Sequence, residues 1–114
     1  MKPVELVPAD SQATVTAGGL INHLCPHVDE ADHGFITISW RCGTSTIELH
    51  SLAAYLEGFA DRRISHEDLV EEIFQDLHDA APAIAVVSVT ARFTTAGLGV
   101  EVSRGAVPVH TVGA

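Results

Sequence analysis

The chain has 114 residues, of which 46% are hydrophobic, enough for one small domain with a core of its own. Acidic residues outnumber basic residues 15 to 6, which gives a formal net charge of −9. Affinity for nucleic acid comes largely from clusters of Lys and Arg. The composition therefore argues against a phosphate-binding surface and makes nucleic acid a doubtful partner.

The sequence contains no apolar run of ~18 residues and no N-terminal charged region followed by an apolar stretch. We therefore expect neither a membrane span nor a signal peptide. The two cysteines, Cys25 and Cys42, are expected to be free thiols, because disulfides are rare in unexported chains. The expected location is the cytoplasm.

The first half of the chain predicts two strands. Residues 1–10 are polar and contain prolines, so we interpret them as an arm or loop. Residues 13–21 predict a strand with a bulge or turn at Gly18-Gly19. A cysteine-containing loop follows, and the alternating segment 35–40 predicts a second strand before a turn at Gly43-Thr44.

The second half predicts two helices and a hairpin. Ser45 or Thr46 is expected to cap a helix that runs to about residue 60. Ser65 and Asp68 resemble a capping box, and the helix they open is expected to end before Pro82. The remaining segments are a strand over residues 84–93, a turn near residue 97, a strand over residues 98–103 and a loose tail over residues 105–114.

The predicted order is β-β-α-α-β-β, which favours an α+β fold in which a four-stranded antiparallel sheet carries two adjacent helices on one face. We predict a single domain over residues 1–114, with its core at about 13–103 and arms at 1–10 and 105–114. The open edges of such a sheet need protection, and oligomerisation through the sheet would provide it.

The stretch around Cys25 is the densest cluster of reactive side chains in the sequence. A free cysteine is most often a small buried hydrophobe. Alternatively, Cys25 is a metal ligand together with His23 and His27, with Cys42 as a further donor, although this spacing is not a recognised zinc pattern. In a third interpretation Cys25 is a nucleophile, with Asp32 as the acid or base that it requires.

Carboxylates occur at the starts of both predicted helices. Glu48 begins the first helix and His66-Glu67 begins the second. Acidic residues at these positions are ordinary, because they complement the helix dipole. A functional interpretation is that they face one pocket, where a carboxylate would accept paired N–H donors from a guanine-like edge.

In spacing, the chain resembles the QueF family of 7-cyano-7-deazaguanine nitrile reductases, which have the tunnelling fold (T-fold). The family has Cys-Pro, an Asp seven residues after the Cys, a Glu-containing helical segment, and a His-Glu pair at the next helix. The matching residues here are Cys25-Pro26, Asp32, Glu48 and His66-Glu67. The family's separations are reproduced without gaps, and the resemblance covers roughly residues 13–103.

This resemblance implies roles for individual residues. Cys25 would attack the nitrile carbon to form a covalent thioimide, and Asp32 would protonate the nitrile nitrogen. Glu67 would hold the deazaguanine edge with His66 beside it. At the first helix, Ile47, Glu48 and Leu49 would line the base pocket.

Several cations of the family are absent from this chain. Two family lysines correspond to His50 and Ala53, and a family arginine corresponds to Ala60. In the family these positions help to bind NADPH phosphates, and each lost charge-assisted hydrogen bond costs ~1.5–3 kcal/mol. No cofactor is therefore favoured; if the chain were a reductase, NADPH would be the cofactor and His50 would partly replace a lysine.

The pattern is most similar to the shorter QueF-like proteins, in which ammonia resolves the thioimide to a formamidine. Three alternatives are an NADPH-dependent reductase, a non-catalytic deazapurine-binding T-fold protein, and a zinc enzyme that uses His23, Cys25 and His27. The expected partners are a small 7-deazapurine, as free base or nucleoside, and further copies of the chain in a ring, a pentamer or decamer, with sites between subunits. No metal is expected under the favoured interpretation.

Overall fold

The computed structural model describes residues 1–106 of the chain. The strands are β1 (Leu6–Pro8), β2 (Thr14–Leu24), β3 (Ala31–Cys42), β4 (Ser45–Ile47), β5 (Ile84–Thr95) and β6 (Leu98–Gly105), and the helices are α1 (Leu49–Glu57) and α2 (His66–His78). In this part of the chain neither helix is long and apolar enough to cross a membrane.

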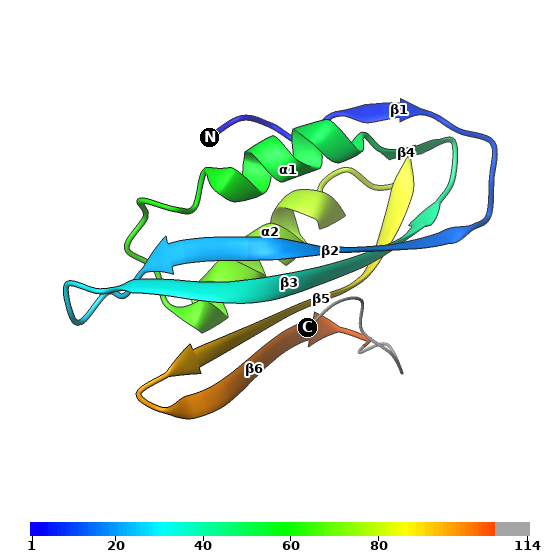
Figure 1. The fold of residues 1–114 in the computed structure, drawn as a ribbon. Helices are drawn as coiled ribbons and strands as arrows, with labels where there is room; N and C mark the ends of the chain where they lie inside the picture. The colour runs from blue at the N-terminus through cyan, green and yellow to red at the C-terminus, as the bar shows by residue number, and fades with distance from the viewer. Residues whose placement is uncertain (107–114) are drawn as a thin grey trace.

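The strands β2, β3, β5 and β6 form one antiparallel sheet in that order. Both helices lie on the same face of this sheet (Figure 1). The sequence-based prediction of an α+β fold with the order β-β-α-α-β-β is confirmed. The open edges are β2 and β6, because each pairs with only one neighbour in the four-stranded sheet.

The core lies between the helices and the sheet. Alternate side chains of the central strand β3 point towards the helices, and Ile36, Ile38 and Trp40 are almost fully buried. The indole N–H of Trp40 donates to Thr46 Oγ1 at 3.0 Å, so this large side chain is buried without an unpaired donor. The helices contribute these buried residues: Leu52 and Tyr55 from α1, and Leu69, Val70, Ile73 and Leu77 from α2.

The prediction for the first helix was wrong at its start. Ser45 and Thr46 belong to β4, which pairs with β1 instead of capping a helix. Glu48 is the N-cap of α1, and its carboxylate accepts from the backbone N–H groups of His50 at 2.7 Å and Ser51 at 3.0 Å. The prediction of an arm or loop over residues 1–10 was also wrong, because β1 lies within this segment and pairs with β4.

Two other predictions need correction. The ladder between β2 and β3 continues through Gly18↔Thr37 and Gly19↔Ile36 with no bulge or turn at the glycines. The last strand extends to Gly105, so the predicted tail begins later than residue 105; residues 107–114 of that tail lie outside the described residues. The Ser65 cap is confirmed, because Ser65 Oγ accepts from the Asp68 N–H at 3.1 Å.

Gly34 lies opposite Phe93, where β3 pairs with β5. A Cβ added there would stand 2.4 Å from the carbonyl oxygen of Arg92 and 2.5 Å from the ring of Phe93. We predict that Gly34→Ala lowers the free energy of unfolding by ~1–3 kcal/mol through overpacking. Urea denaturation followed by Trp40 fluorescence measures this effect.

Gly19 on the adjacent strand provides the matched control, because a Cβ there meets nothing within 4 Å. Gly19→Ala should leave stability unchanged or raise it by up to about 1 kcal/mol. Equal destabilisation by the two substitutions would contradict the close approach at Gly34.

Candidate functional site

The loop that carries Cys25 joins the end of β2 to the start of β3 and is fastened to the connector between the helices. Leu24 N–H donates to Arg62 O at 2.9 Å, and Ile64 N–H donates to Leu24 O at 3.1 Å. Arg63 reaches across the loop and donates to Cys25 O at 3.1 Å and to Asp29 at 2.7 Å. These contacts fix the loop although Pro26 prevents regular structure there.

A pocket of about 230 Å³ opens beside this loop. Cys25, Asp32 and Thr95 line it together with residues of the loop and of the β5–β6 turn. Ala96 and Gly97 form that turn with φ of 54° and 77°, which suits the two-residue hairpin type that places Thr95 at the pocket wall. The structure thus brings the predicted nucleophile and the predicted acid to one pocket.

The Cys25 side chain is a half-buried free thiol, whereas Cys42 is a buried free thiol whose Sγ–H donates to Thr46 Oγ1 at 3.3 Å. The backbone N–H of His27 donates to Cys25 Sγ at 3.5 Å. Cys25 therefore combines access to a pocket with a donor at its sulfur, the setting expected of a reactive cysteine. The prediction that both cysteines are free is confirmed.

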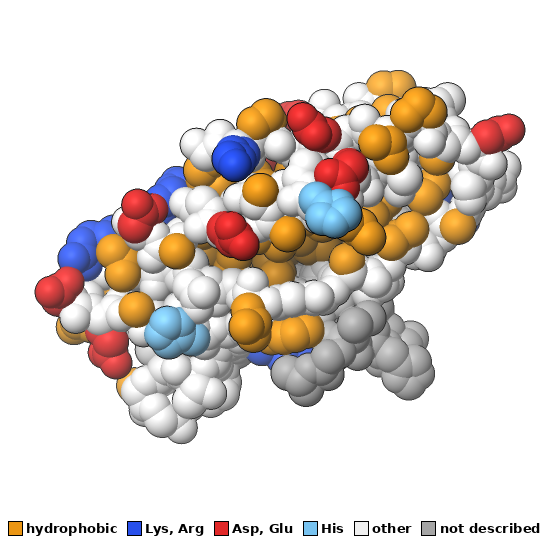
Figure 2. Space-filling view, turned by 45° about the horizontal axis from the view of Figure 1, so that its top comes forward, with side chains coloured by type: hydrophobic (Ala, Val, Ile, Leu, Met, Phe, Trp, Pro, Cys, Tyr) orange, Lys and Arg blue, Asp and Glu red, His pale blue; other side chains and the backbone are white. Residues whose placement is uncertain are grey.

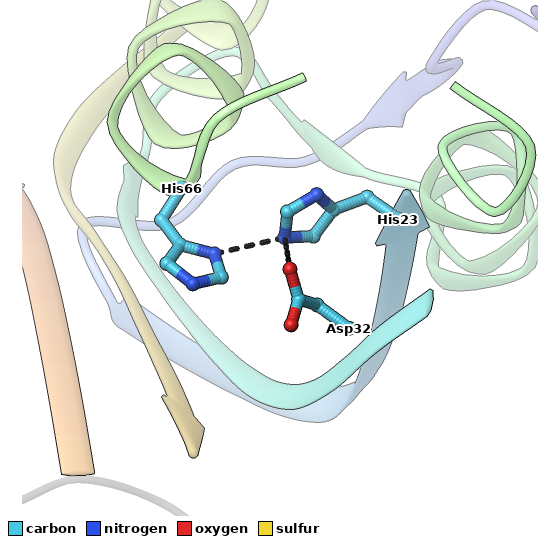
Figure 3. A group of neighbouring side chains, drawn as sticks. All are labelled: His23, Asp32 and His66. Atoms are coloured by element: carbon cyan, nitrogen blue, oxygen red, sulfur yellow. Dashed lines mark hydrogen bonds and ion pairs between the residues drawn. The ribbon is translucent and has the colours of Figure 1, made fainter. Parts of the chain in front are cut away.

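Beside Asp32 lies a group of polar side chains from β2, β3 and α2, in which His23 and Asp32 are buried and His66 is half-buried (Figure 3). His23 Nε2 lies 2.8 Å from His66 Nδ1 and 3.8 Å from Asp32 Oδ2. His66 Nε2 lies 3.0 Å from Thr95 Oγ1, and the Thr95 hydroxyl donates to Asp32 Oδ1 at 3.5 Å. The contacts through Thr95 and His23 therefore link Asp32 to His66, a residue for which the sequence predicted a role.

The ring of His66 stacks on Phe93 with centroids 4.1 Å apart, and the edge of His23 meets the same ring at 5.0 Å. Burial lowers the pKa of His66 from its ordinary value, and the nearby His23 lowers it further; Asp32 and Glu67 oppose this shift. The lowered pKa favours the neutral form of the His66 ring.

The predicted zinc set of His23, Cys25 and His27 is not assembled. Among the described residues, the group of His, Cys, Asp or Glu that lies close enough for a shared metal is His23, Asp32 and His66. Two nitrogens on one tetrahedral zinc lie about 3.3 Å apart, given Zn–N bonds of about 2.0–2.1 Å. The observed 2.8 Å between His23 and His66 is a hydrogen bond rather than a ligand spacing.

The other predicted binding residues do not line the Cys25 pocket within one chain. Ile47 is buried in the core, and Glu48 is occupied in capping α1. Leu49 is 56% exposed and lines a groove between α1 and the edge strand β2. His50 is exposed and lies 3.1 Å from the Glu48 carboxylate. Their assignment to a base pocket stays a prediction.

Glu67 follows His66 in the first turn of α2, and its side chain is exposed rather than directed into the pocket. Binding of a substrate edge by Glu67 therefore stays a prediction.

Sequence reasoning missed Thr95 and treated His23 only as a metal ligand. The signal for His23 is the hairpin register, which places it directly across from Asp32.

Cationic side chains are few, and most of the arginines form ion pairs. Figure 2 shows Asp and Glu side chains spread over the face drawn, with few Lys or Arg. Within residues 1–106, Arg63, Arg92 and Arg104 contact Asp29, Glu101 and Glu71, and a further pair joins Arg62 to Glu72. The pocket lining contains His33 but neither Lys nor Arg.

Comparison with known proteins gives three results. A family model described as QueF-like protein matches residues 31–110. The chain is 36% identical over 98 residues to an NADPH-dependent 7-cyano-7-deazaguanine reductase of Xanthomonas campestris, covering 85% of this chain and 33% of that protein. It is 37% identical over 57 residues to a protein of the same name from Prochlorococcus marinus, covering 50% of this chain and 42% of that one.

The third result is structural. The fold is similar to the crystal structure of the archaeosine synthase QueF-Like in its apo form, with a TM-score of 0.76 over 87% of this chain and 100% of that one, at 19% identity. The chain therefore belongs to the QueF-like family. It spans about a third of the length of the Xanthomonas relatives that it matches.

His66 predicts a pH dependence of stability. Its pKa is lower in the folded than in the unfolded chain, so the stability it contributes is fully present above about pH 6.5 and is lost as the pH falls through the folded pKa. We predict that the free energy of unfolding falls less between pH 7 and pH 5 in His66→Gln than in the wild type. Urea denaturation at several pH values measures this difference.

The matched control is His78→Gln at the other end of α2, where the side chain is exposed. This variant should retain the wild-type pH dependence. If the stability of His66→Gln showed the same pH dependence as the wild type, the lowered pKa of His66 would be contradicted.

Proposed function

We propose that the protein is an enzyme of the 7-deazaguanine pathway that adds ammonia to the nitrile of 7-cyano-7-deazaguanine through a covalent thioimide at Cys25. The observation that carries the proposal is the shared pocket of Cys25 and Asp32 in a chain of the QueF-like family. A thiolate is well suited to attack a nitrile near neutral pH. The nitrogen that becomes negative needs an acid in reach, and Asp32 is that acid.

In the first step a bond forms between Cys25 Sγ and the nitrile carbon, and the nitrile nitrogen takes a proton from Asp32. In the second step ammonia attacks the same carbon and the C–S bond breaks, which restores Cys25 and leaves a formamidine. The proton that ammonia gives up returns to Asp32. The sum is one nitrile plus one ammonia giving one amidine, with no reductant consumed.

The scarcity of free cations supports ammonia as the second reactant. NADPH carries phosphates that need Lys or Arg, and the arginines named above are paired with carboxylates. Ammonia needs no cationic surface.

NADPH-dependent reduction is the second candidate. It is favoured by the names of the relatives, which are NADPH-dependent 7-cyano-7-deazaguanine reductases, and by the 85% of this chain that the Xanthomonas match covers. In that case the thioimide would be reduced, and His50 would contribute to cofactor binding.

Incubation with 7-cyano-7-deazaguanine followed by intact mass spectrometry tests the first step. We predict a covalent adduct in the wild type and in Cys42→Ala, and none in Cys25→Ala. Cys42 is the matched control because it is a buried thiol remote from the pocket lining. Absence of the adduct from the wild type would reject thioimide chemistry.

The second reactant is tested by adding ammonium or NADPH separately to the adduct. Loss of the adduct with release of a formamidine product on ammonium supports the proposal. Consumption of NADPH with release of an aminomethyl product would reject it in favour of the reductase.

We also propose that the site is completed by a second copy of the chain in a ring-shaped homo-oligomer, a pentamer or a decamer. The open edges of β2 and β6 and the exposed Leu20 and Leu49 beside the groove support this assembly. We predict elution as an oligomer in size exclusion with light scattering. Elution of the wild type as a monomer would contradict it.

A further inference from the structure

A series of polar contacts connects Asp32 to His23, a side chain that the proposed reaction does not use. His23 is 1% exposed and is absent from the lining of the Cys25 pocket, whereas Asp32 and Thr95 both line it. The contacts run from His23 to His66, from His66 to Thr95 and from Thr95 to Asp32. A buried histidine with both ring nitrogens engaged has fixed donor and acceptor roles, which can be worked out.

One end of the chain is fixed by a backbone carbonyl. His23 Nδ1 lies 3.3 Å from Leu24 O, and a carbonyl oxygen only accepts, so His23 Nδ1 carries a hydrogen. If Asp32 is a carboxylate, it also only accepts, and the Thr95 hydroxyl donates to it. His66 Nε2 must then donate to Thr95. Because the lowered pKa of His66 favours its neutral ring, His66 Nδ1 then accepts from His23 Nε2. His23 therefore carries two hydrogens and is an imidazolium.

The same atoms have a second fully hydrogen-bonded arrangement. If Asp32 carries the proton, it donates to Thr95, and Thr95 donates to His66 Nε2. His66 Nδ1 then donates to His23 Nε2, and His23 is neutral. Both arrangements hold the same number of protons and the same net charge; they differ only by a proton that has moved between Asp32 and His23 while His66 changes tautomer.

We propose that His23 is a positioning residue that stores a proton for Asp32 and exchanges it through His66 and Thr95. The inference rests on the proposed function, because these contacts would supply the proton that the nitrile nitrogen receives. The direct separation of 3.8 Å between His23 and Asp32 is too long for a hydrogen bond, so the exchange runs through the two intervening side chains.

The exchange accounts for every proton that moves in the proposed reaction. The proposed cycle starts with His23 as an imidazolium, Asp32 as a carboxylate and Cys25 as a thiolate. As the S–C bond forms, the nitrile nitrogen takes a proton from Asp32, which His23 has supplied. When ammonia attacks and the C–S bond breaks, the proton lost by ammonia passes to Asp32 and back to His23. The cycle needs no net proton from water.

Groups from three elements surround His23. Asp32 faces His23 from β3, and His66 faces it from α2 with Glu67 beside it. β5 contributes Thr95 and the uncharged ring of Phe93. Cys25, Glu30 and His33 line the pocket together with Asp32, and Arg63 donates to the backbone of Cys25.

Substitution of Thr95 tests the exchange, because Val has the same shape without the hydroxyl. We expect Thr95→Val to slow adduct formation by about tenfold or more. Its rate relative to the wild type should fall further as the pH rises, because Asp32 must then take its proton from water. Thr95→Ser retains the hydroxyl and should restore both the rate and the pH profile. A Thr95→Val protein with the wild-type rate and profile would overturn the proposal.

Nitrogen-15 NMR of the histidine rings tests the same proposal without substrate. In the wild type we expect His23 to be protonated on both nitrogens and His66 to carry its hydrogen on Nε2. In Asp32→Asn the carboxylate charge is gone, so His23 should become neutral and the hydrogen of His66 should move to Nδ1. His78→Gln serves as the control and should leave both rings unchanged.

An unchanged His66 tautomer in folded Asp32→Asn would overturn the proposal, as would stoichiometric zinc bound between His23 and His66. The NMR result also separates this inference from the proposed function. If the wild type forms no adduct but the tautomer switch is observed, the proposed reaction is rejected. The proton exchange between His23 and Asp32 is then still supported.

Discussion

The hydrogen bond between His23 and His66 is the constraint on which the functional end of the molecule depends. A polar ring that is 1% exposed must have partners, because burial without them costs several kcal/mol. His23 comes from β2 and His66 from the start of α2, 43 positions away in the sequence. Their contact therefore fixes where the second helix begins relative to the sheet, and both rings pack on Phe93 of β5.

The position of Asp32 follows from the same arrangement. The β2–β3 register sets Asp32 across from His23, and the short β5–β6 turn brings Thr95 to its other side. Asp32 is 8% exposed but still reaches the pocket that Cys25 lines. A nearly buried acid that lines the same pocket as a free thiol has the environment in which a proton is transferred directly rather than through bulk water.

Membership of the QueF-like family leaves the second reactant open, because its matched relatives are named reductases while a structural neighbour is an archaeosine synthase. The charge distribution separates the two possibilities physically. A reductase must hold a polyanionic cofactor, whereas in this chain most arginines already bind carboxylates. The nitrile attack that we propose needs only Cys25 and Asp32, which line one pocket.

The sequence by itself determined the order of the two helices and of the four strands of the main sheet, the Ser65 cap, the free cysteines and the candidate pair of Cys25 and Asp32, because these follow from local periodicity, capping chemistry, cysteine usage and spacing. It did not determine the start of α1. Ser45 and Thr46 are good caps, yet they pair with β1, a partner distant in sequence. Backbone pairing between distant segments leaves little local signal.

Only the tertiary structure decided which contacts His23, His66 and Thr95 make. Their order along the chain is consistent with metal ligands, an ordinary helix start and a plain turn residue. Packing brings them within hydrogen-bond distance of one another and of Asp32. The direction of each hydrogen bond depends on all its neighbours, and those neighbours come from four different elements, so no reading of one segment could supply it.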